Sequence, residues 1–192
     1  MKLYYIRPSP YGRKVLVVAH EKGLLDRLEL IQIDPWADPP ELLAVTPIGK
    51  VPVLVTDDGG VITESAIIGE YLDGIGTGPR LIQGDRISVL ARAAIAQGLT
   101  DAAFAIVIER RRPAERQWTN WIDRQRRAVE RTLASVRRPD GGRFDLGDIT
   151  LACGLAYLDF RLPEIEWRRA YPPLAGWLDE VGRRPSMQAT VP

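Results

Sequence analysis

The chain has 192 residues, 45% apolar and 27% charged, and its net charge of +1 excludes the strong field that draws a protein to nucleic acid. Its one cysteine, Cys153, excludes an internal disulfide, and its one histidine, His20, excludes a histidine-based metal or nucleophile cluster. No apolar run approaches about 18 residues and the N-terminus lacks a signal-peptide pattern, so we expect a cytoplasmic protein without nucleic-acid, membrane or metal partners.

The first part of the chain begins with strand and helix patterns in alternation. The run KLYYI at 2–6 predicts a strand. A helix follows, because Ser9 is a good N-cap and Pro10 suits the first helical position. The alternating LELIQI at 28–33 predicts a second strand, and PELLAV at 40–45 predicts a short helix.

A β-hairpin and a helix complete this part. KVPVLV at 50–55 and VIT at 61–63 flank Asp58-Gly59, a strong hairpin signal. SAIIGEYLDG at 65–74 predicts a helix. The order is therefore β-α-β followed by β-β-α, which is an α/β arrangement over residues 1–75.

Helical patterns alone follow the segment 76–84, whose glycine and proline content is typical of a linker. The start of one helix is specified twice, by an Asp145–Asp148 capping box and by a hydrophobic staple of Phe144 and Ile149. Four helices are expected, at 85–112, 114–138, 144–160 and 172–184, with PDGG at 139–142 breaking the chain. We therefore expect two domains, 1–75 and 85–192, joined by 76–84.

Ser9 stands where the first strand turns into the first helix, and two interpretations of it are open. Serine is a common N-cap, so its role is structural in the first. In the second, its hydroxyl and the positive end of the helix bind something with negative charge. Arg13 and Lys14, one turn further on, are expected to be solvated surface charges.

Two further positions suggest a peptide ligand. Pro52 lies within a strand pattern but cannot donate a ladder hydrogen bond, which predicts an edge or a turn. If the bond before it is cis, Val51 presents free backbone groups to an extended peptide. Ser65 begins a helix and suits a carboxylate, while Glu64 suits an ammonium, so the pair fits an amino-acid end; a simple helix start is the alternative.

The motifs SPYGRKV, TPIGKVPVL, ESAIIGEYL and FDLGDITLACGLAYL, in this order over the whole chain, resemble the cytosolic glutathione S-transferase family. The pattern is most similar to serine-type bacterial members. This resemblance implies a thioredoxin-like N-terminal domain with a mixed four-stranded sheet, an all-helical C-terminal domain, a homodimer and a cis bond before Pro52. The chain is slightly short for the family, and we expect the shortening around 138–143.

The resemblance also implies that glutathione is the co-substrate. Ser9 matches the catalytic position, where it stabilises the glutathione thiolate as a hydrogen-bond donor rather than acting as a nucleophile. Tyr5 is the alternative donor, and the absence of cysteine at this turn argues against the reductase-like members. The positions that match the family's glutathione contacts are Lys50, Val51, Pro52, Glu64 and Ser65.

The other substrate is expected to be a small apolar electrophile, with Tyr11, Phe104 and Trp118 as candidate lining residues. The alternative function is a binding module that keeps the fold and acts through protein partners. The intact Ser9 and Glu64 favour the transferase. Peroxidase or isomerase activity would use the same thiolate, and the sequence does not separate these reactions from conjugation.

Overall fold

The computed structural model describes residues 1–139 and 142–192. The chain forms two compact units, which are described separately below. The first unit comprises residues 1–83 together with 185–192, and the second comprises 84–184. The break expected at 139–142 and the shortened loop expected at 138–143 include residues 140 and 141, which lie outside the described part of the chain.

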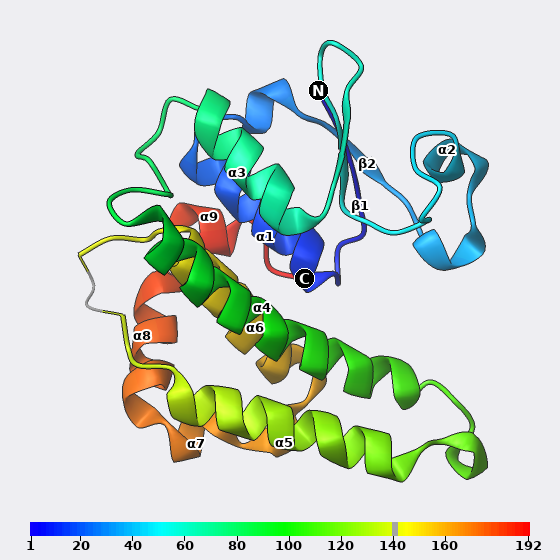
Figure 1. The fold of residues 1–192 in the computed structure, drawn as a ribbon, viewed down its shortest axis with the longest axis vertical. Helices are drawn as coiled ribbons and strands as arrows, with labels where there is room; N and C mark the ends of the chain where they lie inside the picture. The colour runs from blue at the N-terminus through cyan, green and yellow to red at the C-terminus, as the bar shows by residue number, and fades with distance from the viewer. Residues whose placement is uncertain (140–141) are drawn as a thin grey trace. The chain divides into compact units, whose positions relative to one another are not determined.

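Within the described residues, the first unit contains a mixed four-stranded sheet with the strand order β2-β1-β3-β4 (Figure 1). Its strands are β1 (Lys2–Tyr5), β2 (Glu29–Gln32), β3 (Val53–Val55) and β4 (Val61–Thr63). β1 pairs parallel with β2 and antiparallel with β3, and β3 pairs antiparallel with β4. The mixed sheet is confirmed, although β3 starts only after Pro52, which lacks the amide that a ladder requires.

Helices cover both faces of this sheet. They are α1 (Pro10–Glu21), α2 (Pro40–Leu43), α3 (Ser65–Ile75) and the short α9 (Pro185–Gln188). Figure 1 shows α1 and α3 on one side of the strands and α2 on the other. On the α2 side, Tyr4, Leu42 and Val53 form one buried cluster, whereas Leu3 and Leu54 alternate with them along the strands and are fully buried.

The second unit is helical throughout its described residues, as the sequence predicted. Its helices are α4 (Arg86–Glu109), α5 (Thr119–Ser135), α6 (Leu146–Arg161), α7 (Trp167–Ala170) and α8 (Pro172–Val181). α4 packs along α5 and α6, and almost every residue of α6 from 146 to 158 is buried. The helix expected at 114–138 is shorter, because 114–116 forms a separate 3₁₀ turn.

The capping box expected at the start of α6 is confirmed. The Asp145 carboxylate accepts a hydrogen bond from the Asp148 amide at 3.1 Å, and the Asp148 carboxylate accepts one from the Asp145 amide at 3.3 Å. Arg92 of α4 donates to both carboxylates, with its Nη1 at 3.0 Å from Asp148 Oδ1. Arg92 therefore ties α4 to the end of α6 where the positive pole of the helix lies.

α4 is the one helix among the described residues that is long and apolar enough to cross a membrane, with a mean hydropathy of 1.4 over its most apolar window. About 39% of that window is buried in the structure, and the helix packs against α5 and α6. Length and composition of this kind are also found in core helices of globular proteins.

Candidate functional site

The strand register brings three separate sequence segments to one edge of the sheet. Tyr4 of β1 pairs with Val53 of β3, and Val53 pairs in turn with Thr63 of β4. The end of β1, the start of β3 and the end of β4 therefore lie in one row. We call this edge the site edge, because the segments that leave or enter the sheet there carry Ser9, Pro52 and the Glu64-Ser65 pair.

At the first of these segments, the turn between β1 and α1 is held by Ser9. Its side-chain Oγ accepts a hydrogen bond from the Gly12 amide at 3.2 Å, and its carbonyl accepts one from the Arg13 amide at 2.9 Å. The Ser9 amide donates to the Ile6 carbonyl at 3.1 Å. Ser9 is thus an N-cap, and its hydroxyl is left with a proton to donate, since only its acceptor capacity is used here.

The second segment enters β3. The Val51–Pro52 peptide bond is cis, Pro52 is buried and Val51 is half-buried. Lys50 is exposed and follows Gly49, whose φ of 58° is one that glycine adopts readily. The contact of Lys50, Val51 and Pro52 with a tripeptide remains a prediction.

Glu64 has a backbone conformation that non-glycine residues rarely adopt, with φ 67° and ψ 117°. Its side chain is exposed and does not cap α3, although it directly precedes that helix. Ser65, the first residue of α3, is only 3% exposed. A strained backbone beside a helix start, with an exposed carboxylate that caps nothing, is typical of a ligand site. The sequence patterns gave no sign of this strain.

The electrostatics of the site edge favour an anion. α1 and α3 pack against each other and both begin at this edge, so their positive poles lie together. Neither helix has an acidic residue in its first turn to compensate that field. A negatively charged sulfur or carboxylate would therefore be stabilised here, while the exposed Glu64 carboxylate beside it would suit a positive group.

The three residues expected to line an electrophile pocket have different surroundings. Tyr11 is half-buried in α1 and Phe104 is half-buried in α4. Trp118 is 62% exposed and stacks on Trp121, with ring centroids 6.0 Å apart. That these side chains contact one small molecule remains a prediction.

The structure corrects one expectation near the site. Arg13 and Lys14, expected to be solvated, are only 7% and 2% exposed. Arg13 Nη2 donates to the Met187 carbonyl at 3.2 Å, and its Nε lies 3.4 Å from Thr190 Oγ1. For Arg13 the reason is tertiary: residues 187–190 bond to its side chain, which no pattern within the helix itself reveals.

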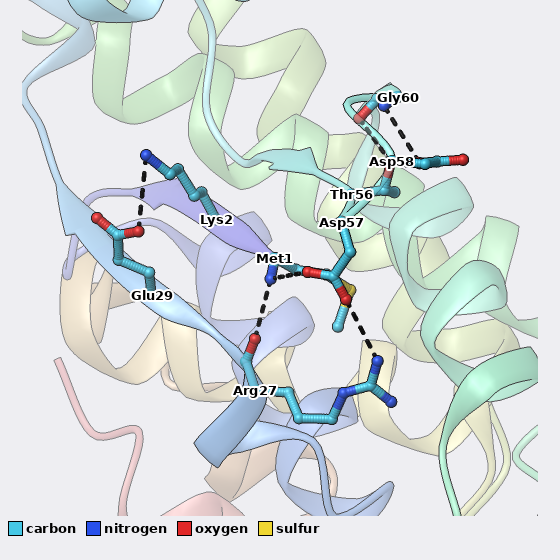
Figure 2. Close-up of polar contacts among 8 residues, drawn as sticks. All are labelled: Met1, Lys2, Arg27, Glu29, Thr56, Asp57, Asp58 and Gly60. Atoms are coloured by element: carbon cyan, nitrogen blue, oxygen red, sulfur yellow. Dashed lines mark hydrogen bonds and ion pairs between the residues drawn. The ribbon is translucent and has the colours of Figure 1, made fainter.

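The opposite edge of the sheet carries a shallow depression of about 510 Å³, which none of the predicted site residues lines. The amino group of Met1 bonds to Asp57 Oδ1 at 2.5 Å and to the Arg27 carbonyl at 3.2 Å, as Figure 2 shows. Lys2 pairs with Glu29 at 3.7 Å. Because these charged groups pair with one another, we place the proposed chemistry at the site edge and not at this depression.

The described residues contain no group of three His, Cys, Asp or Glu side chains arranged for a metal ion.

Two family models match the chain. The model of the glutathione S-transferase N-terminal domain matches residues 8–75, and that of the glutathione S-transferase C-terminal domain matches residues 119–180. Among curated proteins, the uncharacterized GST-like protein YibF of Escherichia coli is 32% identical over 201 residues, which is 100% of this chain and 98% of that relative.

Solved structures agree with these matches. A glutathione transferase family member from Pseudomonas fluorescens Pf-5, with bound glutathione, is 40% identical and superposes with a TM-score of 0.94 over 100% of this chain and 98% of that one. A glutathione S-transferase from Methylobacillus flagellatus KT, with GSH bound, is 36% identical with a TM-score of 0.88, over 100% and 98% of the two chains.

Proposed function

The chain belongs to the glutathione S-transferase family, and on that premise we propose that it binds glutathione at the site edge and stabilises the thiolate for attack on a small apolar electrophile. The observation that carries the proposal is the strand register. It places the Ser9 turn, the Val51–Pro52 bond and the Glu64-Ser65 pair at one edge of one sheet. The glutathione bound to the Pseudomonas fluorescens and Methylobacillus flagellatus relatives supports the same ligand.

In the proposed complex, the two charges of the γ-glutamyl end of the tripeptide each meet a group of complementary chemistry. The α-carboxylate of the γ-glutamyl residue binds at the start of α3, at Ser65. The ammonium of the same residue pairs with the Glu64 carboxylate. The cysteinyl backbone pairs with Val51 beside Pro52, and Lys50 contacts the middle of the peptide. This arrangement directs the thiol toward the start of α1, where Ser9 lies.

The proposed role of Ser9 is to donate its hydroxyl proton to the sulfur. A thiol has a reference pKa near 8.5, so only a few per cent is thiolate at neutral pH. Lowering that pKa by one unit requires about 1.4 kcal/mol of preference for the anion. A charge-assisted hydrogen bond and the positive pole of α1 together are of this size, roughly 1–2 kcal/mol.

The experiment compares three substitutions of Ser9 that separate its cap from its donor. We expect Ser9→Ala, which removes both, to raise the pKa of the bound thiol by about one unit and to lower turnover of a chloronitroaromatic at pH 6.5 about tenfold. Ser9→Asp keeps a capping oxygen but has no proton to donate at this pH, so it should be at least as impaired. Ser9→Thr keeps both functions and should retain most activity.

The pKa is measured from the thiolate absorbance of the bound tripeptide during a pH titration. If Ser9→Asp is as active as the wild type, the cap alone matters and Ser9 is not the donor. Tyr5→Phe is the parallel variant: a raised pKa in it, with none in Ser9→Ala, would assign the donor to Tyr5.

Binding is tested separately from turnover. We expect retention on immobilised glutathione and a thermal shift with millimolar glutathione, both weakened in Glu64→Gln. Binding without turnover would favour the alternative function, a module that acts through protein partners. Neither retention nor a thermal shift would contradict the proposed ligand itself.

We further propose that the protein is a cytoplasmic homodimer. α4 has exposed apolar or small residues at positions that share one face of the helix, namely Ile87, Ala91, Ala94, Ile95 and Gly98. Ile87 is 69% exposed and Ile95 is 54% exposed. An apolar stripe of this kind on a soluble protein is typically covered by a partner, and a second copy of the chain is the partner that the family suggests.

A further inference from the structure

The last residues of the chain belong to the unit that carries the candidate site. Residues 185–192, which we call the C-terminal strap, cluster with residues 1–83 and pack on α1 through α9. Ser186 is fully buried and Met187 is 2% exposed. Figure 1 shows this red segment running beside the blue α1.

The strap follows α1 from its last turn back to its first. Ser186, at the start of the strap, donates its hydroxyl proton to the Glu21 carboxylate at the end of α1. Thr190, four residues later, lies against Arg13 near the start of the helix, 3.4 Å from its Nε. The two segments therefore run in opposite directions, with a polar contact near each end of α1.

Arg13 is the anchor at the end nearest Ser9. Its buried guanidinium donates to the Met187 carbonyl at 3.2 Å, across 174 residues of sequence. Thr190 Oγ1, the other oxygen facing it, also bonds to the Ser186 carbonyl at 2.9 Å. Buried cations normally pair with a carboxylate, yet no ion pair to Arg13 forms within residues 1–139 and 142–192. Two oxygens of the strap, the Met187 carbonyl and Thr190 Oγ1, accept the hydrogen bonds of Arg13 instead.

The same residue takes part in the turn that Ser9 caps. The Arg13 amide donates to the Ser9 carbonyl at 2.9 Å, and the neighbouring Gly12 amide donates to Ser9 Oγ at 3.2 Å. A movement of Arg13 would therefore disturb its bond to the Ser9 carbonyl and, through the neighbouring Gly12, the bond that holds the Ser9 Oγ. Helix first turns fray readily, and a buried tertiary anchor in the first turn opposes that.

We infer that the C-terminal strap is a positioning element for Ser9, acting through Arg13, which is a positioning residue and not a catalytic one. Its effect on the glutathione thiol rests on the proposed function, whereas its effect on the turn itself does not. The strap holds the first turn of α1 closed, so that the Ser9 hydroxyl keeps one orientation when the tripeptide binds.

The first experiment measures hydrogen exchange of the amides of Gly12 and Arg13 in the full chain. We expect exchange to be roughly tenfold faster in Arg13→Gln, the effect of losing a buried hydrogen bond from a charged donor. Thr190→Val, which removes one hydroxyl from the strap at nearly constant volume, should accelerate it roughly threefold. Arg7→Gln is the matched control: it removes one exposed cation near Ser9 but no hydrogen bond or ion pair to the strap, so exchange should not change.

The second experiment measures the pKa of the bound glutathione thiol in the same variants. We expect Arg13→Gln to raise it by about half a unit, less than Ser9→Ala, and Arg13→Lys to restore part of the difference because it keeps one charged donor. Unchanged exchange in both Arg13→Gln and Thr190→Val would overturn the inference. So would faster exchange with an unchanged thiol pKa in a protein where Ser9→Ala does shift it, since the strap would then be structural only.

The two experiments also separate this inference from the proposed function. If Ser9→Ala leaves the thiol pKa unchanged, the proposed role of Ser9 fails, and the exchange data alone decide whether the strap orders the turn. If Ser9→Ala shifts the pKa but neither strap variant changes any measurement, the proposed function stands and the strap inference fails.

Discussion

Lys22 is a fully buried charge whose three donor hydrogens each have an acceptor. Its Nζ lies 2.7 Å from the Gly78 carbonyl, 2.8 Å from the Pro79 carbonyl and 3.0 Å from Asp73 Oδ1. Asp73 in turn accepts from the amide of Leu81 at 2.8 Å. The segment 76–84, whose composition suggested a linker, is therefore fixed to α1 and α3 over most of its length.

Glycine is required in this segment for a reason that composition does not disclose. A Cβ on Gly78 would lie 2.0 Å from the Glu21 carbonyl oxygen, and one on Gly76 would lie 2.5 Å from Lys22 Cβ. From the sequence, the glycines and prolines of this segment were interpreted as linker composition, because a linker and a close approach of two backbones both use glycine. Only the tertiary position of Lys22 distinguishes the two.

Replacement of Lys22 tests how strongly this contact holds the first unit together. We expect Lys22→Met to lower the free energy of unfolding by about 3–5 kcal/mol, because it leaves the Asp73 carboxylate buried without its cation. Lys22→Arg should not restore stability, since a planar fork does not match three converging oxygens. The measurement is urea unfolding at pH 7.

The double variant with Asp73→Asn serves as the control for the unpaired charge. It should be less destabilised than Lys22→Met alone, because no isolated carboxylate remains in the interior. A loss below about 1 kcal/mol for Lys22→Met would contradict the account, since a removed buried partner normally costs more than that.

At the scale of elements, the predictable features were those that residues close together in the sequence specify. The start of α6 is fixed by Asp145, Asp148 and two apolar neighbours, all close in sequence, and the structure has the expected capping box. α7 and α9 were not expected, because four residues cover barely one helical turn and so contain no repeat of the apolar pattern. The contact of Arg92 with this cap could likewise not be predicted from local patterns, because Arg92 lies on another helix.

The α6 cap has an acid–base consequence. Burial and then the neighbouring Asp145 charge raise the pKa of Asp148 to about 6, although Arg92 opposes the shift. A carboxyl with a raised pKa holds its proton more tightly in the folded chain than in the unfolded chain. Its contribution to the free energy of unfolding is therefore fully present at a pH below the ordinary pKa of the group, and it is lost as pH rises through about 6.

We therefore expect Asp148→Asn to be more destabilising at pH 4.5 than at pH 7.5, by about 1–2 kcal/mol. Urea unfolding of both proteins at the two pH values measures the difference. Asp123→Asn, at an exposed position of α5, controls for the loss of one acidic side chain. A difference of the opposite sign would mean that Arg92 outweighs burial and keeps Asp148 charged in the folded state.

At the scale of the whole molecule, local patterns account for the order of the elements, whereas the grouping of the last residues with the first unit depends on long-range contacts. The local patterns predicted the order of strands and helices along the chain, and the family resemblance implied the mixed sheet. The register that aligns Tyr4, Val53 and Thr63 then gathers Ser9, Pro52 and Glu64 at one edge. The residues 185–192 join the first unit through contacts more than 160 residues apart, such as that of Ser186 with Glu21. Long-range contacts of this kind leave no periodic trace in the sequence.

The proposed dimer gives the test at this scale. Sedimentation equilibrium should report twice the chain mass of 21.4 kDa for the wild type and the single chain mass for Ile95→Asp, because a charge on the α4 stripe would be buried unpaired at the interface. Leu30→Asp, which places the same charge at an exposed position of β2, should remain dimeric. A wild-type mass of one chain at tens of micromolar would contradict the proposal.

The return of residues 185–192 to the first unit has a consequence for biosynthesis. Translation makes the sheet and α1 before the other unit, and it makes the segment that covers Arg13 only after that unit. During synthesis, the face of α1 that carries Arg13 therefore stays uncovered until every helix of the other unit has emerged. A gene truncated after codon 83 would encode the first unit without the segment that covers Arg13.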